Sequence, residues 1–175
     1  MLFIAVGTGV GGALVLGGQL RRGHSSTAGE VGTLLVDVSR ARADSAVLAG
    51  RLESYASGPA IAERYCDLAQ TIRLLDLRAV AERARQGDAL AQAAVAEGAM
   101  ILGLALNGLL NTLDPEALII GGGVPMLGDL WWKPFVNTIR SNPMPGPSCI
   151  AIRAAELLTH APIAGAGALA FDHLA

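Results

Sequence analysis

Short apolar runs broken by glycines fill the first part of the chain, and they have the length and composition of buried strands. Residues 2–6 end at a glycine cluster, and residues 13–16 form a second run. Gly17-Gly18 is a two-residue hairpin signal, so a return strand is expected to begin at residues 19–21. Residues 31–38 are a further strand candidate. The polar stretch 39–50 is expected to be a surface loop.

Helical spacing dominates from residue 59 onward. Ser57, Asp76 and Asp88 are each placed to cap a following helix, and Asp114-Pro115 should end the longest one. The patterns predict helices at 59–70, 77–86, 89–113, 127–140 and 162–173, with short buried strands at 117–120 and 149–152. Hairpins followed by β–α–β–α predict an α/β fold in which helices flank one mixed sheet.

Composition narrows the class of protein. The chain has 175 residues, a net charge of -2 and 52% hydrophobic residues, which excludes disorder and suits one domain or one lobe. A pI of 5.9 with scattered basic residues argues against nucleic acid as a partner. The mean hydropathy of +0.47 indicates a large buried face or an oligomer contact.

Neither a leader nor a metal-binding cysteine pattern is predicted. The uncharged start is broken by glycines, and residues 98–113 are too short to span a bilayer, so no membrane segment is expected. Cys66 and Cys149 are far apart and form no CxxC pair, which disfavours a disulfide scaffold or a cysteine zinc site. Reduced cysteines suit a cytoplasmic protein.

Two glycine clusters are candidate nucleotide contacts. Gly7-Thr8-Gly9-Val10-Gly11-Gly12 lies between two predicted strands, where glycines let backbone N–H groups approach an anion and Thr8 adds a hydroxyl. Gly121-Gly122-Gly123 follows a buried strand, the place where open α/β sheets bind ligands. The alternatives are a tight turn that contacts no ligand and a loop that only needs positive φ. The spacing fits neither a Rossmann nor a Walker motif.

Two carboxylates are candidate sugar contacts. Glu30 and Glu53 are each flanked by small or apolar residues, and such a carboxylate can accept hydrogen bonds from vicinal hydroxyls. The alternative is an acid at a helix start or in a loop that pairs with a nearby arginine. His24, His160 and His173 show no ligand spacing. Trp131-Trp132 is expected to pack or to anchor an interface.

Taken together, these motifs resemble the ROK family, which contains bacterial sugar kinases and sugar-responsive repressors. The resemblance rests on ordered segments along nearly the whole chain: the 7–12 glycine cluster, Arg22-Gly23, Ala28-Gly29-Glu30-Val31-Gly32, residues 52–61, Asp114-Pro115-Glu116, residues 119–124 and residues 164–168. It implies the actin/hexokinase-like (ribonuclease H-like) fold, in which two lobes close over sugar and ATP. Residues 1–175 resemble a single C-terminal lobe, with the N-terminal lobe absent.

The resemblance also implies roles for residues. The nucleotide would be ATP with Mg²⁺, with Gly7, Thr8, Gly9 and Gly11 at its phosphates and Gly122 and Gly123 near its nucleoside. Glu30 and Glu53 would hold the sugar hydroxyls. The expected partners are sugar and nucleotide, the missing lobe and a second copy in a homo-oligomer such as a dimer. Neither nucleic acid nor a membrane is expected as a direct partner.

Three departures from the family pattern affect catalysis. The family's aspartate base lies upstream of the glycine turn, so no catalytic residue is assigned here. The zinc-binding histidine of the family's Glu-x-Gly-His is Thr33, and its cysteine cluster is replaced by residues 44–50. Zinc is therefore not expected. Loss of a general base alone costs about 10²–10⁴-fold in rate, so we expect no kinase activity from this chain alone.

Three functions remain open. The first is the C-terminal lobe of an ATP-dependent kinase for a hexose or an N-acetylhexosamine. The second is the effector-binding half of a sugar-responsive transcriptional repressor. The third is a non-catalytic remnant that persists as an oligomer, held by the long helix expected at 89–113.

Overall fold

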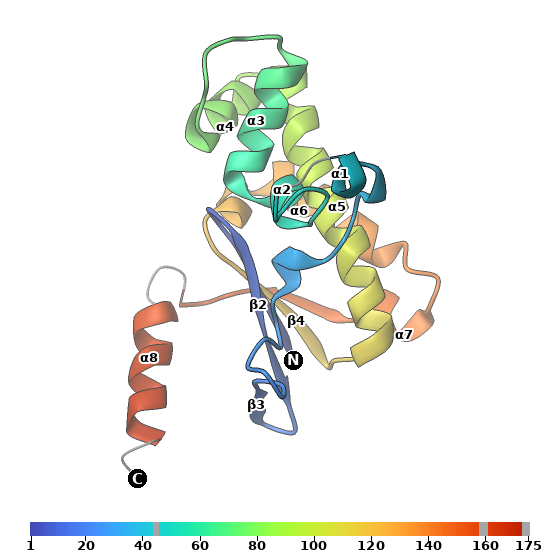
Figure 1. Ribbon diagram of the computed structural model, residues 1–175, viewed down its shortest axis with the longest axis vertical. Helices are drawn as coiled ribbons and strands as arrows, with labels where there is room; N and C mark the ends of the chain where they lie inside the picture. Colours follow the sequence, from blue (N-terminus) through green and yellow to red (C-terminus); the bar gives the residue numbers. More distant parts are fainter. Residues whose placement is uncertain (44–45, 158–160, 173–175) are drawn as a thin grey trace.

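The computed structural model describes residues 1–43, 46–157 and 161–172. Their strands form one mixed sheet in the order β3-β2-β1-β4-β5 (Figure 1). The strands are β1 (Leu2–Val6), β2 (Val10–Leu16), β3 (Gln19–Arg21), β4 (Ala117–Gly121) and β5 (Ala151–Ala154). β2 is antiparallel to β1 and to β3, whereas β4 is parallel to β1 and to β5. This arrangement confirms the predicted mixed sheet, with hairpins first and a β–α–β crossover afterwards.

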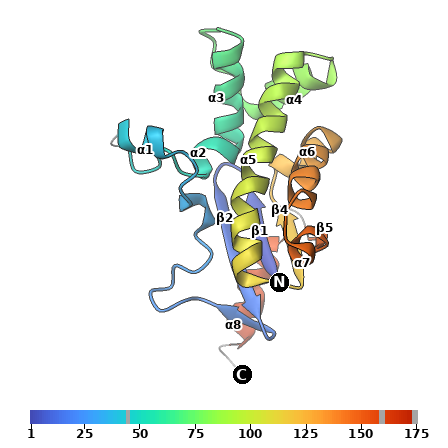
Figure 2. The same ribbon diagram turned by 90° about the vertical axis from the view of Figure 1, so that its right-hand side faces the viewer.

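One face of the sheet forms the core. Alternate residues of β1 and β4 are buried, because successive side chains of a strand point to opposite faces. The long helix α5 (Ala89–Leu113) and α6 (Asp129–Arg140) pack against each other beside the sheet (Figure 2). Trp131 and Phe135 of α6 stack at 4.8 Å between ring centroids within this core, and both are fully buried.

A second group of helices extends beyond the sheet. It consists of α3 (Gly58–Leu68), α4 (Leu77–Arg85) and the first half of α5 (Figure 1). Their predicted caps are confirmed, since Ser57, Asp76 and Asp88 each accept a hydrogen bond from the backbone N–H three residues later. Asp114 ends α5 in the left-handed region, at φ 40°. These ends agree with the sequence because capping is a local interaction.

The strand predicted at 31–38 is wrong. The chain forms the 3₁₀ helix η1 (Val31–Thr33), makes one isolated bridge between Leu35 and Arg51, and enters α1 (Val38–Ala43). Gly29, at φ 101°, turns the chain, and a side chain at Gly32 would strike the Val10 carbonyl, so this segment packs across β2 instead of pairing with it. The loop expected at 39–50 therefore begins as a helix, and residues 44 and 45 lie outside the described part.

Other differences are small. β2 begins at Val10, so Gly11 lies within a strand rather than in the turn. Three short helices were not predicted: α2 (Glu53–Ala56), η2 (Val124–Leu127) and α7 (Pro145–Ser148). β5 starts two residues later than expected, because Cys149 donates its N–H to Gly146 and completes the turn of α7. The last helix is α8 (Ala161–Asp172), and its predicted end at residue 173 lies outside the described residues.

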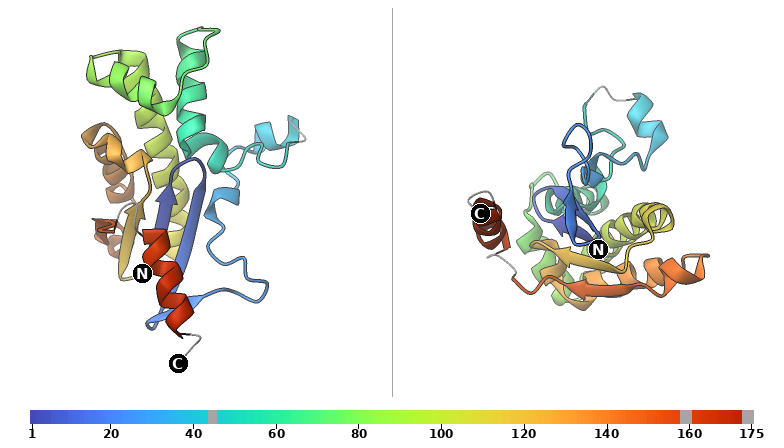
Figure 3. Two further views of the ribbon diagram at one scale, coloured as in Figure 1. Left: turned by 90° about the vertical axis from the view of Figure 1, so that its left-hand side faces the viewer. Right: turned by 90° about the horizontal axis from the view of Figure 1, so that it is seen from below.

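Two helices are unusually apolar. Among the described residues, α5 alone is long and apolar enough to span a membrane by length and composition, yet one side of it supplies buried residues such as Leu102 and Leu106 to the core. α8 stands apart from the sheet (Figures 1 and 3), with Ile163 75% exposed. The first pattern is that of a core helix, and the second leaves an apolar surface uncovered.

Candidate functional site

The turn between β1 and β2 is fixed by its backbone. Gly7 donates its N–H to the Gly9 carbonyl at 2.9 Å, and the Gly7 carbonyl accepts the N–H of Gly58 at 2.8 Å. The second bond ties the turn to the first residue of α3. Thr8 is exposed at the tip, and its hydroxyl has no hydrogen bond within the described residues. This hydroxyl is therefore free to bind a ligand.

The second glycine cluster meets the same end of the sheet. Gly122 has φ 95°, and a side chain there would strike the backbone of Val6 at the end of β1. Gly122 thus allows the chain to cross the end of β1 closely. Gly123 follows with a negative φ and open space around its Cα. The two turns come together because β1 and β4 are parallel neighbours, so their carboxyl ends lie at one edge.

A cavity of about 740 Å³ opens between these turns and the helices. Its size falls in the usual range for small-molecule sites. It is lined by Gly7, Thr8, Gly58, Pro59, Ala62, Glu63, Cys66, residues 74–78, Gly123 and Val124. Three of the predicted nucleotide residues, Gly7, Thr8 and Gly123, thus line the same cavity. Gly9, Gly11 and Gly122 are not among its lining residues.

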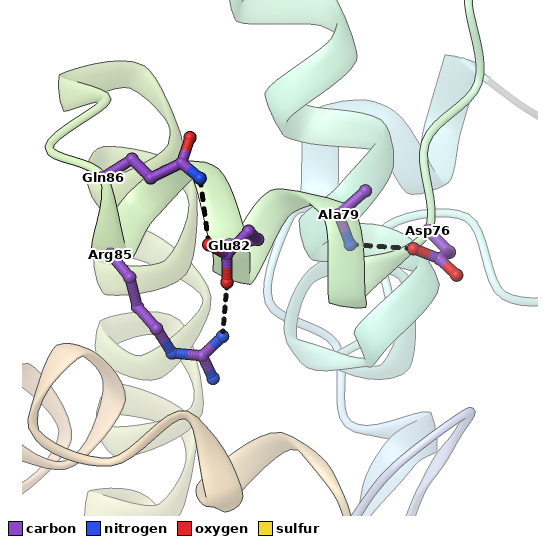
Figure 4. A network of polar contacts seen from close by, with 5 residues as sticks. All are labelled: Asp76, Ala79, Glu82, Arg85 and Gln86. Atoms are coloured by element: carbon purple, nitrogen blue, oxygen red, sulfur yellow. Dashed lines mark hydrogen bonds and ion pairs between the residues drawn. The ribbon is translucent and has the colours of Figure 1, made fainter.

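Helix starts form one wall of the cavity. Asp76 holds the first turn of α4 through its hydrogen bond with Ala79, while Glu82 contacts Arg85 and Gln86 further along (Figure 4). The exposed Arg78 lies just inside that helix and has no ion pair or hydrogen bond among the described residues. The charged side chains of the lining are therefore the Arg78 guanidinium and two carboxylates, Glu63 and Asp76, of which Asp76 caps the helix.

Most of this wall was missed by sequence reasoning. Pro59, Cys66 and Leu74 line the cavity, and none carries a motif of its own. The local signals are the caps at Ser57 and Asp76, which place the starts of α3 and α4 but do not say what those starts face. Cys66 is buried and donates its Sγ–H to the Arg73 carbonyl at 3.5 Å, so it anchors the α3–α4 connection.

Glu53 lies on the opposite side of the turn. It is the first residue of α2, and its Oε2 accepts the N–H of Val10 at 2.8 Å. A side chain at Gly9 would lie 2.5 Å from the same oxygen, and one at Gly32 would lie 3.4 Å from it. Glycine at these two positions leaves room for the carboxylate. Oε1 makes no hydrogen bond in the described structure and can accept one from a hydroxyl.

Glu30 lies just before η1, on the chain that leads to Gly32. Its side chain is exposed, with no hydrogen bond or ion pair in the described part of the chain. The described residues show no hydrogen bond between it and Glu53, although Gly32, two residues on, abuts that carboxylate. Glu53 is an acid at a helix start, as the alternative supposed, but neither glutamate forms an ion pair with an arginine in the described part of the chain.

The described residues of this region do not form a zinc site. Thr33 occupies the position where the ROK resemblance implies a ligand, and its hydroxyl donates to the Glu30 carbonyl at 2.7 Å. Among the described residues, no three His, Cys, Asp or Glu side chains are grouped to hold a metal ion. The two cysteines are also apart, since Cys66 lines the cavity and Cys149 follows α7.

Comparison with known proteins identifies the family. A sequence model of the ROK family matches residues 1–173. The chain belongs to the ROK family. It is 33% identical to the glucokinase of Halalkalibacterium halodurans over 157 residues, which cover 83% of this chain and 48% of that protein. It is also 28% identical to a putative xylose repressor of Caldicellulosiruptor over 142 residues, or 75% of this chain and 35% of that one.

The fold is that of solved ROK structures. The ROK family glucokinase of Streptomyces griseus, solved with glucose and AMPPNP, superposes with a TM-score of 0.81 at 30% identity. The match covers 96% of this chain and 59% of that one. The two glucokinases therefore match this chain over most of its length, whereas the chain spans only about half of theirs. The actin/hexokinase-like fold implied by the sequence motifs is confirmed.

Proposed function

We propose that this chain is the C-terminal, ligand-binding lobe of a ROK sugar kinase. The observation that supports it best is the shared turn: Thr8 faces the cavity on one side, and Glu53 holds the backbone of Val10 on the other. A nucleotide in the cavity and a sugar at Glu53 would then meet at the residues between them. That placement is what transfer of a phosphoryl group to a sugar hydroxyl requires.

Each residue has a role in this proposal. The Thr8 hydroxyl binds a phosphate of ATP, Gly123 gives the nucleoside a flat wall, and Arg78 contacts the nucleotide at the cavity rim. Mg²⁺ bound with the nucleotide would neutralise phosphate charge. Glu30 and the free Oε1 of Glu53 accept hydrogen bonds from hydroxyls of a hexose or an N-acetylhexosamine. Gly9 and Gly11 act through the backbone shape of the turn.

The general base would come from a second lobe outside residues 1–175. The uncovered apolar surface of α8 supports a companion lobe, as does the half-length match to the relatives. Without that lobe we expect binding but no phosphoryl transfer by this chain. We also propose that the protein forms a homo-oligomer in the cytoplasm.

Calorimetric titration tests the nucleotide part. AMPPNP–Mg²⁺ should bind saturably to the wild-type chain, and Gly123→Leu should abolish that binding. A Cβ at Gly123 meets nothing within 4 Å, so the leucine fits the fold but fills the cavity. Gly108→Leu is the matched control, because Gly108 is equally open but lies on the exposed side of α5. Equal nucleotide affinity in both variants would contradict the assignment.

The effector half of a repressor is the second candidate. The similarity to a putative xylose repressor favours it, and so does Thr33 at a position where a kinase of the family would bind metal. In that case the chain would bind sugar at Glu30 and Glu53 but would not bind AMPPNP. The reading frame upstream of Met1 separates the two, since a helix-turn-helix there supports the repressor and a second kinase lobe supports the enzyme.

A further inference from the structure

The segment 34–52 leaves the body after η1 and returns just before Glu53. Its two ends are joined by backbone hydrogen bonds: the Gly50 carbonyl accepts the N–H groups of both Val36, at 2.9 Å, and Asp37, at 3.0 Å. Leu52 donates its N–H to Leu34 at 2.8 Å. Apolar packing is confined to its ends, where Leu52 is fully buried and Leu34 and Val36 pack against the core. α1 itself has no buried residue, so hydrogen bonds hold the part of the segment that carries this helix.

Side-chain hydrogen bonds connect the segment to the helix of Glu53: Ser54 donates to the Leu48 carbonyl at 2.9 Å, and Tyr55 reaches Asp37, next to α1. The Tyr55 hydroxyl donates to Oδ2 of Asp37 at 2.7 Å, and Oδ1 of Asp37 accepts the backbone N–H of Arg40 at 2.9 Å. Both oxygens of Asp37 are thus occupied. The hydrogen bonds from Arg40 and Tyr55 lower the pKa of Asp37, so the carboxylate remains charged and a strong acceptor at neutral pH.

Tyr55 is also held from the body of the molecule. Arg64 of α3 donates from Nη2 to the Tyr55 carbonyl at 3.1 Å and pairs with Glu97 of α5 at 3.4 Å. Because α2 is a single turn, its orientation depends on such contacts. Tyr55 lies two residues after Glu53 and is fixed on one side by Arg64 and on the other by Asp37.

We propose that Asp37 and Tyr55 are positioning residues that hold the Glu53 carboxylate at the Val10 backbone without a metal ion. The inference rests on the proposed function in so far as Glu53 binds sugar. Its physical basis is that the described residues around Thr33 offer no group of metal ligands, while the Asp37–Tyr55 hydrogen bond ties the same segment to α2. The sugar affinity of the chain then depends on this bond.

The amide of Val10 reports the position of Glu53 directly, because it donates to that carboxylate. In Tyr55→Phe, we expect amide exchange at Val10, followed by NMR, to accelerate about tenfold, as befits loss of one hydrogen bond to a charged group. Exchange at Ile4, in the core of β1, should not change. The affinity for glucose or N-acetylmannosamine should fall by a similar factor.

Two variants separate positioning from general stability. Asp37→Asn keeps an acceptor oxygen and should restore most of the Val10 protection that Asp37→Ala loses. Tyr65→Phe removes a similar hydrogen bond, from Tyr65 to Asp88 at 2.8 Å, but on the far side of α3. It should leave Val10 exchange and sugar affinity unchanged. Should Tyr55→Phe fail to fold, the comparison of Asp37→Asn with Asp37→Ala serves in its place.

A separate experiment tests whether Glu53 is held in place without a metal ion. Neither EDTA nor an equivalent of Zn²⁺ should alter the unfolding midpoint or Val10 exchange of the wild-type chain. A shift with either reagent, or unchanged Val10 exchange in Tyr55→Phe, would overturn the inference. If the wild type binds neither sugar while Val10 exchange still accelerates in the variant, the positioning inference stands and sugar binding is the part that fails.

Discussion

Two tyrosine–aspartate hydrogen bonds of nearly equal length connect very different regions. Tyr55 donates to Asp37 at 2.7 Å, and Tyr65 donates to Asp88 at 2.8 Å. Tyr65 is almost fully buried where α3 meets α4 and α5, surrounded by apolar contacts. Tyr55 joins a segment whose helix α1 buries nothing. The same bond is therefore one of many contacts in the helical body, but it is a principal side-chain contact between α2 and the start of α1.

The largest difference between the two regions should appear on truncating an apolar side chain. Leu106→Ala in the fully buried part of α5 should lower the free energy of unfolding by about 2–5 kcal/mol, since it leaves a cavity. Leu35→Ala, at a side chain 47% exposed within the 34–52 segment, should change it by less than about 0.5 kcal/mol. Urea denaturation measures both. Equal losses would mean that the segment has an apolar core of its own.

Replacing a glycine at a turn should instead destabilise the 34–52 segment more than the helical body. Gly50 has φ 70°, and a methyl group there would collide with the Asp37 carbonyl and Ala41. Gly87→Ala, at φ 94° with open space, carries only the left-handed strain of about 1–2 kcal/mol. We expect Gly50→Ala to cost more, and limited proteolysis to cleave its 34–52 segment much faster than that of Gly87→Ala. Similar cleavage of the two variants would show that the Gly50 turn does not close the segment.

Acid should weaken both pairs, which is the smallest effect. Hydrogen bonds lower the pKa of Asp37 and of Asp88 below 3.8. A lowered pKa contributes stability that is complete above the unfolded value and is lost as pH falls through the folded one. The midpoint temperature of thermal unfolding should therefore fall as the pH is lowered below about 4. Asp37→Asn and Asp88→Asn should each make this temperature less dependent on pH.

Asp37→Asn and Asp88→Asn should differ in their effect on amide exchange at Val10 in acid. Acid exchange measurements on wild type should show Val10 losing protection together with Asp37 protonation, because Glu53 lies beyond that bond. Asp88→Asn should not change this coupling. Thermal unfolding between pH 2.5 and 6 gives the global part. If amide exchange at Val10 instead accelerated with the protonation of Asp88, the two regions would not behave differently.

The elements that could be predicted correctly from the sequence are those whose signals are local. The apolar run of β1, the caps at Asp76 and Asp88 and the stop of α5 at Asp114 depend on neighbours within a few residues, and all were found where expected. The strand predicted at 31–38 failed because its apolar residues were read without the backbone contact between Gly32 and Val10. That contact spans more than twenty positions, and periodicity carries no information about it.

The candidate site divides in the same way. Composition and motifs singled out Thr8, Gly123, Glu30 and Glu53, because small residues and isolated carboxylates stand out in any sequence. Only the tertiary structure decided that Thr8 and Gly123 line one cavity, and that Glu53 meets the N–H of Val10, 43 positions away. The parallel pairing of β1 with β4 and the return of the chain through α2 create those neighbours. Such contacts depend on how whole elements pack, which no local pattern specifies.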